Sequence, residues 1–172
     1  MRFIKNLIAY CLPALAVVIL FRVVFCLIYV PTTSMEPEIR ANSLCLSWRL
    51  PYLLFSEHEV DRGDIVVFYS AEKHKDLCKR VIGLPGEHIS FRDGDVYING
   101  EFLDDYSAEP HSTFCGRTFD VPEGCVFCMG DNRLNSADCR LMEDPYIEIS
   151  TISSRILGSV HLPNTEEAVE EN

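Results

Sequence analysis

The 172-residue chain has the length of one domain, and its 48% hydrophobic and 24% charged residues argue against wholesale disorder and against a collagen-like chain. Its net charge of −11 is unevenly distributed. Residues 1–30 contain Arg2, Lys5 and Arg22 but no acid, so the other 142 residues carry −14. A nucleic-acid partner is excluded because an acidic domain lacks the basic surface that neutralises phosphates.

The N-terminal segment is apolar, and residues 7–30 contain a single charge, Arg22. As a helix these 24 residues reach about 36 Å, enough to cross a hydrocarbon core of about 30 Å. A cleaved secretory signal and a buried helix are the alternatives, but no small-residue pair follows the run. We predict a transmembrane anchor. The basic residues before it place residues 1–6 in the cytoplasm and the rest of the chain outside.

Short apolar runs between turn signals predict a mainly antiparallel β domain over residues 31–163, followed by a disordered acidic tail over 164–172. The expected strands cover 64–69, 77–82, 88–91, 96–98, 102–103, 126–129 and 156–161. The Asp-Gly pair at 93–94 and the Asn-Gly pair at 99–100 predict two consecutive hairpins. Residues 144–153 have irregularly spaced isoleucines that hint at a helix.

Two of the eight cysteines lie in the predicted anchor, which leaves six outside. Six cysteines allow 15 complete pairings, so the sequence leaves the disulfides open. Cys125 and Cys128 have Cys-x-x-Cys spacing but lack a second ligand pair, which disfavours zinc. We expect them to be small buried side chains.

Three places carry candidate chemistry. Ser34 follows the anchor directly, among the hydroxyls and prolines of residues 31–37, and the alternative is a polar turn at the membrane surface. Lys79 lies within an apolar strand, where desolvation lowers a lysine pKa and makes the amine a possible general base, although a lysine at a strand edge is the alternative. Residues 129–140 gather polar side chains that either orient a base or form a loop with surface ion pairs.

Four segments in order resemble the successive boxes of the type I signal peptidase family. They are Ser34-Met35 with Pro37, residues 62–67, residues 79–86 and residues 130–140. The resemblance implies an antiparallel β-sheet catalytic domain behind one N-terminal transmembrane helix. Only 43 residues separate the last two boxes, which matches the compact form of Gram-positive bacteria without a large cap domain. Lysine rather than histidine at position 79 argues against the endoplasmic-reticulum and archaeal branch.

The resemblance further implies a membrane-anchored serine endopeptidase that removes signal peptides after small residues at −1 and −3. Ser34 matches the nucleophile and Lys79 the general base. Nine more residues match positions around this dyad. Thr32 joins the Ser34 amide in the oxyanion hole, Ser136 orients the lysine, Asp131, Arg133, Asp138 and Arg140 support the site, and Val30, Met35 and Cys78 line the substrate pockets.

The implied partners are exported preproteins and membrane lipid, close to the secretion translocon. The implied location is the plasma membrane, crossed once, and neither a cofactor nor a metal is implied. Cys139 departs from the serine usual in the last box. Leu77 and Cys78 replace larger or aromatic residues, which is expected to alter the pocket size.

Three rival readings remain. A Ser-His-Asp hydrolase would need one of five histidines, none in a recognisable triad context: His58, His74, His88, His111 and His161. A self-cleaving repressor would carry a DNA-binding domain where this chain has its apolar segment. A non-catalytic membrane-anchored β domain that binds a protein partner would make Ser34 and Lys79 incidental.

Overall fold

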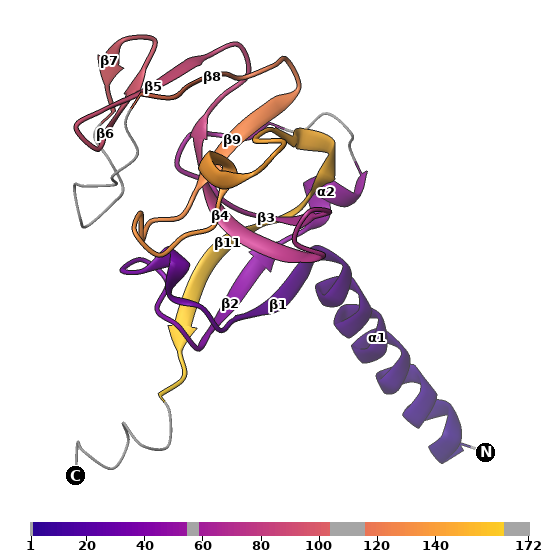
Figure 1. The fold of residues 1–172 in the computed structure, drawn as a ribbon. Helices are drawn as coiled ribbons and strands as arrows, with labels where there is room; N and C mark the ends of the chain where they lie inside the picture. Colours follow the sequence, from indigo (N-terminus) through magenta and orange to yellow (C-terminus); the bar gives the residue numbers. More distant parts are fainter. Residues whose placement is uncertain (1, 55–58, 104–115, 164–172) are drawn as a thin grey trace.

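The computed structural model describes residues 2–54, 59–103 and 116–163. In this part of the chain the strands form two antiparallel sheets, and helix α1 (Arg2–Val24) projects away from the larger one (Figure 1). The strand order is β1-β2-β11-β3-β4-β9-β10 in the larger sheet and β7-β6-β5-β8 in the smaller. The prediction of a mainly antiparallel β fold is confirmed.

The larger sheet contains β1 (Phe25–Val30), β2 (Ser43–Trp48), β3 (Ile65–Ser70), β4 (Lys75–Gly83), β9 (Cys125–Met129), β10 (Ile147–Glu148) and β11 (Ile152–His161). The smaller sheet contains β5 (His88–Arg92), β6 (Asp95–Ile98), β7 (Glu101–Phe102) and β8 (Thr118–Asp120). Short helical turns complete the described elements: α2 (Leu50–Leu54), η1 (Thr33–Met35), η2 (Cys139–Leu141) and η3 (Ile149–Thr151).

The two predicted hairpins are confirmed as β5–β6 and β6–β7. Asp93 and Gly94 have φ angles of 52° and 94°, and Asn99 and Gly100 have 52° and 86°. Two consecutive positive φ angles define the turn that matches the twist of paired strands, which explains the Asp-Gly and Asn-Gly pairs.

The predicted helix over residues 7–30 ends early. α1 stops at Val24, and Phe25–Val30 pair with β2 from Phe25↔Trp48 to Val30↔Ser43. Strand pairing satisfies the backbone of these six residues, and their aromatic and β-branched side chains suit a strand. Among the described residues, no helix is found that is long and apolar enough to cross a membrane, so the predicted anchor is not confirmed.

Of the helix hinted at over 144–153, the structure has only the short turn η3 (Ile149–Thr151), between β10 and β11. Ile147 lies in β10 opposite Val126, and Ile152 begins β11 opposite Phe68. Both isoleucines are buried in strands, on either side of η3, so their irregular spacing reflects sheet packing rather than a helix face. The predicted acidic tail lies outside the described residues.

The core has two parts, and the smaller one positions the site. The larger cluster fills the space between the sheets, where the Phe119 and Phe127 rings lie 4.7 Å apart. The smaller cluster consists of Val30, Met35, Ile39 and Cys45. Because Met35 is fully buried there, it anchors the turn η1 that also carries Ser34.

Candidate active site

Ser34 and Lys79 meet at the junction of η1 and β4. Lys79 Nζ lies 2.8 Å from Ser34 Oγ, although 45 residues separate the two in the chain. Lys79 is 3% exposed and Ser34 9% exposed, so the pair is largely shielded from water. A serine hydroxyl in hydrogen-bond contact with a buried amine has the arrangement of an activated nucleophile and its base.

The surroundings of Lys79 favour the neutral amine. Burial lowers the pKa of Lys79 below its ordinary value of 10.5, and the negative charge of Asp138 opposes this only in part. Besides contacting Ser34, Lys79 Nζ donates to the Cys78 carbonyl oxygen at 3.0 Å. Desolvation is therefore the dominant influence, as expected for a lysine inside an apolar sheet.

The backbone around Ser34 is held by the loop that follows β9. The Asn132 amide donates to the Ser34 carbonyl oxygen at 3.1 Å. A Cβ atom added to Gly130 would lie 2.4 Å from that same oxygen, so only glycine allows this close approach. The Thr32 hydroxyl lies 3.4 Å from Ser34 Oγ, on the exposed side of the turn.

Two buried ion pairs fix this loop. Asp131 accepts two hydrogen bonds from Arg80, at 2.7 and 2.6 Å, and thus ties the loop to the residue after Lys79. Asp138 pairs with Arg140 and also accepts from the Gly130 amide at 2.9 Å. All four charged residues are buried, so the alternative of surface ion pairs is wrong.

Arg133 and Arg140 add a second set of contacts within the same loop. Arg133 Nε donates to the Gly130 carbonyl oxygen at 3.0 Å, and Arg140 donates to the Arg133 carbonyl oxygen at 2.9 Å. The sequence analysis did not predict the pairing of Arg80 with Asp131. Lys79 and Arg80 are adjacent in β4 and both are buried, and Asp131 provides the carboxylate that pairs with Arg80.

Ser136 lies close to the dyad without contacting it by a hydrogen bond. Its Oγ is buried and has no hydrogen-bond partner among the described residues, so no hydrogen bond joins it to Lys79 Nζ in this structure. The hydroxyl instead packs against Gly130, where an added Cβ would lie 2.2 Å from it. The hydrogen bonds of Lys79 Nζ go to Ser34 Oγ and to the Cys78 carbonyl oxygen.

A pocket of about 240 Å³ opens beside the dyad, between β1 and β4. Val30 and Cys78 line it together with Ser34 and Lys79. Met35 is not among the lining residues and is fully buried in the small core cluster. Burial raises the pKa of the Cys78 thiol to about 12, so this side chain is a neutral, small wall of the pocket.

The described cysteines, Cys115 not among them, are all free thiols. Cys128 and Cys139 are both fully buried, and the Cys128 amide donates to Cys139 Sγ at 3.3 Å. Cys125 and Cys128 lie in β9, and no group of three or more metal-ligating side chains occurs within the described ranges.

The antiparallel β fold thus holds a serine hydroxyl and a lysine amine in contact inside a buried site. The family model described as "Signal peptidase, peptidase S26" matches residues 4–162, and the chain belongs to this family.

Curated relatives support the assignment. The chain is 37% identical to "Probable signal peptidase I-2" of Synechocystis sp. over 116 residues, which are 64% of this chain and 52% of the relative. It is 35% identical to "Signal peptidase I" of Bacillus caldolyticus over 121 residues, which are 62% of this chain and 64% of the relative. The match thus spans between half and two thirds of these relatives.

A solved structure is also similar. The crystal structure of a signal peptidase I from Enterococcus faecalis V583 is 30% identical, with a TM-score of 0.47. The match covers 57% of this chain and 97% of that chain.

Proposed function

We propose that the chain is a membrane-anchored serine endopeptidase that removes N-terminal signal peptides from exported preproteins. The observation that carries this proposal is the 2.8 Å contact between Lys79 Nζ and Ser34 Oγ inside a desolvated site. Membership of the signal peptidase family supplies the substrate class.

The chemistry begins with the neutral amine of Lys79. It takes the Ser34 hydroxyl proton while Oγ attacks the carbonyl carbon of the scissile peptide. The resulting ammonium then protonates the leaving amine, the C–N bond breaks, and the signal peptide remains as an ester on Ser34. Lys79 next deprotonates a water molecule that attacks this ester, and the proton returns to Ser34 Oγ as the signal peptide leaves.

The negative charge of the tetrahedral intermediate needs hydrogen-bond donors. We assign this role to the Ser34 amide and the Thr32 hydroxyl. The position of Thr32 Oγ1, 3.4 Å from the nucleophilic oxygen, supports the assignment. Donors placed before the reaction stabilise charge without reorganising, which is the main electrostatic contribution in such sites.

The 240 Å³ pocket supports a preference for small side chains. An extended substrate between β1 and β4 would place its −1 side chain against Val30, Cys78 and the dyad. Because Lys79 lines this small space, a bulky side chain would press against the base. We therefore propose small residues at −1 and −3.

The apolar N-terminal segment supports a membrane-bound enzyme. Large apolar side chains of α1 are exposed, including Leu12 at 66% and Val17 at 65%, and exposed apolar surface of this kind favours contact with lipid. We propose a single-pass protein of the plasma membrane, with its N-terminus in the cytoplasm and its catalytic domain outside, near the secretion translocon. There it meets preproteins as they emerge.

The test is cleavage of a purified preprotein by the detergent-solubilised full chain. Wild type is expected to release one product whose new N-terminus follows small residues at −1 and −3. Lys79→Ala is expected to lose on the order of 10²–10⁴-fold in rate, and Ser34→Ala at least as much. Lys73→Ala is the matched control, because Lys73 is an exposed lysine paired only with Glu72 in the described part of the chain.

Cleavage by Ser34→Ala at the wild-type rate would overturn the proposal. The proposal would also be overturned if the wild-type enzyme cleaved a preprotein with phenylalanine at −1 as fast as one with a small residue there.

A further inference from the structure

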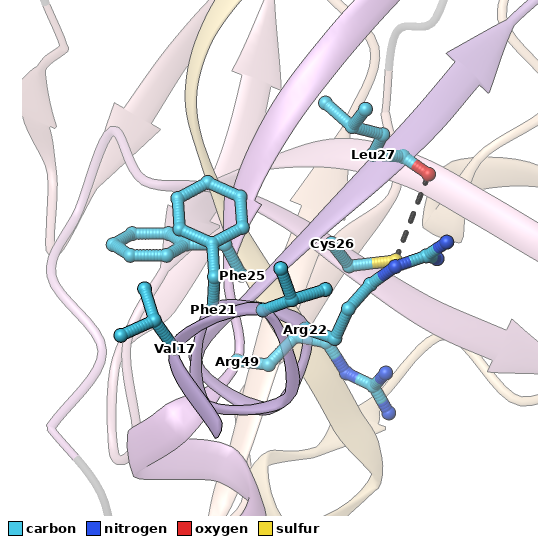
Figure 2. A pocket seen from close by; sticks show the side chains of 8 residues that line it. Val17, Phe21, Arg22, Phe25, Cys26, Leu27 and Arg49 are labelled. Carbon is cyan, nitrogen blue, oxygen red and sulfur yellow. Dashed lines mark hydrogen bonds between the residues drawn. The ribbon is translucent and has the colours of Figure 1, made fainter. Parts of the chain in front are cut away.

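A second pocket lies where α1 meets the larger sheet, and it shares no lining residue with the dyad pocket. Its volume of about 490 Å³ lies in the range of roughly 300–1,000 Å³ that is usual for sites of small molecules. Most of its wall is apolar, but two arginines also line it (Figure 2). The lining residues are Val17, Val18, Phe21, Arg22, Phe25, Cys26, Leu27 and Arg49.

The fold brings the two arginines together from distant parts of the chain. Arg22 lies in the last turn of α1, and Arg49 follows the end of β2. The Arg49 amide donates to the Val24 carbonyl oxygen at 2.8 Å, which ties the end of the helix to the end of the strand. Figure 2 shows both side chains at this pocket, with their guanidinium groups extending to the same side.

Neither guanidinium is neutralised by the described residues. The hydrogen bond drawn among the lining residues joins Cys26 Sγ to the Leu27 carbonyl oxygen at 3.6 Å (Figure 2). No acidic side chain lines the pocket, and residues 1–30 contain none. Two guanidinium groups thus offer their donors, beside an apolar wall, to a ligand that carries negative charge.

An anionic phospholipid is complementary to this pocket, because it combines a negatively charged headgroup with apolar chains. Its phosphate accepts hydrogen bonds from arginine in a forked geometry, and its acyl chains match the apolar wall. Val17, Phe21 and Leu27 are more than half exposed, so acyl chains can reach them from outside the protein. A soluble anion would make no use of this wall.

We propose that the pocket binds an anionic phospholipid, with the headgroup phosphate between Arg22 and Arg49 and the acyl chains along Val17, Phe21 and Leu27. The inference rests on the proposed membrane anchoring by α1, which puts the end of this helix at the membrane surface. The bound lipid joins helix and sheet at one point, and thereby helps to fix the catalytic domain relative to the bilayer.

Trp48 provides a direct probe, since it is the one tryptophan of the chain and precedes Arg49. The full chain in an uncharged detergent is titrated with dihexanoyl phosphatidylglycerol, dihexanoyl phosphatidylcholine or inorganic phosphate. Trp48 fluorescence is recorded, and native mass spectrometry counts the bound lipid. We expect saturable binding of phosphatidylglycerol and much weaker binding of the other two ligands.

The double variant Arg22→Gln/Arg49→Gln is expected to bind phosphatidylglycerol about tenfold or more weakly, given the usual contribution of a basic residue near a lipid surface. Arg92→Gln is the matched control, because Arg92 is an exposed arginine at the end of β5 in the smaller sheet, away from α1 (Figure 1).

Three results would overturn the proposal. Equal binding of phosphatidylcholine would show that the headgroup charge is not recognised, and equal binding of inorganic phosphate would show that the acyl chains contribute nothing. Undiminished binding by the double variant would show that the arginines are not the ligands.

The titration is repeated with Ser34→Ala, which retains the pocket at the end of α1. A failure of the peptidase proposal and a failure of lipid binding are therefore distinguishable.

Discussion

Gly130→Ala tests whether the loop after β9 positions the nucleophile. The added methyl group would lie 2.4 Å from the Ser34 carbonyl oxygen, 2.2 Å from Ser136 Oγ and 2.5 Å from Ser136 Cβ. These separations are far below van der Waals contact, so the loop and the turn η1 must move apart. The hydrogen bond from the Asn132 amide to Ser34 would stretch with them.

Gly130→Ala is expected to lower both the free energy of unfolding and the rate of cleavage. Overpacking in a well-packed interior costs about 1–3 kcal/mol, and each kcal/mol lowers the melting temperature by about 2–4 °C for a domain of this size. A displacement of the nucleophile by about 1 Å costs on the order of 10²-fold in rate. We therefore expect Gly130→Ala to remain folded at 25 °C but to cleave preprotein about 10²-fold more slowly.

The assay compares preprotein cleavage and thermal unfolding in the same preparation. Gly158→Ala is the matched control, since an added Cβ there meets no atom within 4 Å. It should leave both quantities nearly unchanged. In a Ser136→Gly background the clash with the Ser34 carbonyl oxygen remains, so Gly130→Ala should still slow cleavage. Wild-type turnover by Gly130→Ala would refute the reasoning that this close approach positions Ser34.

Further predictions concern stability. Burial lowers the pKa of Lys79 in the folded state, so below pH 10.5 the unfolded chain binds more protons and wild-type stability falls as the pH falls. Lys79→Met should therefore exceed wild type in free energy of unfolding most clearly at pH 7, with the difference shrinking toward pH 10.5; a constant difference in chemical denaturation would contradict this. Asp131→Asn leaves the buried Arg80 without its carboxylate and should cost about 3–5 kcal/mol, whereas Asp64→Asn, in a partly exposed ion pair, should cost about 1 kcal/mol or less. Equal costs in urea unfolding would argue against burial as the cause. Gly100→Ala forces alanine to a φ of 86° in open space, so it should lower stability by about 1–2 kcal/mol without changing cleavage; an unchanged melting temperature would contradict the backbone argument.

The strands that the sequence predicted share a clear local signal. β3 to β6 combine β-branched or aromatic runs with glycine turns, and the positive φ angles at Asp93 and Asn99 match their Asp-Gly and Asn-Gly pairs. β1 was missed because it continues the apolar run of α1, and an apolar run alone does not distinguish strand from helix.

β2 was missed for a different reason. Its buried face carries Ser43, Cys45 and Ser47, whereas Leu44 and Leu46 face outward and line a pocket with β11. Hydropathy alternation would have predicted the opposite face. These half-buried leucines belong to an apolar surface shared with β11, and no pattern within β2 reveals it.

The sequence around Ser34 and around Lys79 marks each as a candidate, but no local signal pairs them, because they are far apart in sequence and meet only in the folded chain. Their pairing was predicted through resemblance to a family. The roles that the resemblance implies for Met35 and Ser136 stay predictions: Met35 lies in the small core cluster, and Ser136 Oγ has no hydrogen-bond partner among the described residues. The partner of Arg80 depends on the fold of a loop 51 residues away.

The pH dependence of kcat/KM for preprotein cleavage tests the central claim most directly. If Lys79 acts as a neutral base, log kcat/KM rises with unit slope as the pH increases and levels off at an apparent pKa well below 10.5. A profile without this limb, or one whose limb lies at 10.5, would contradict a desolvated Lys79 as the base for Ser34.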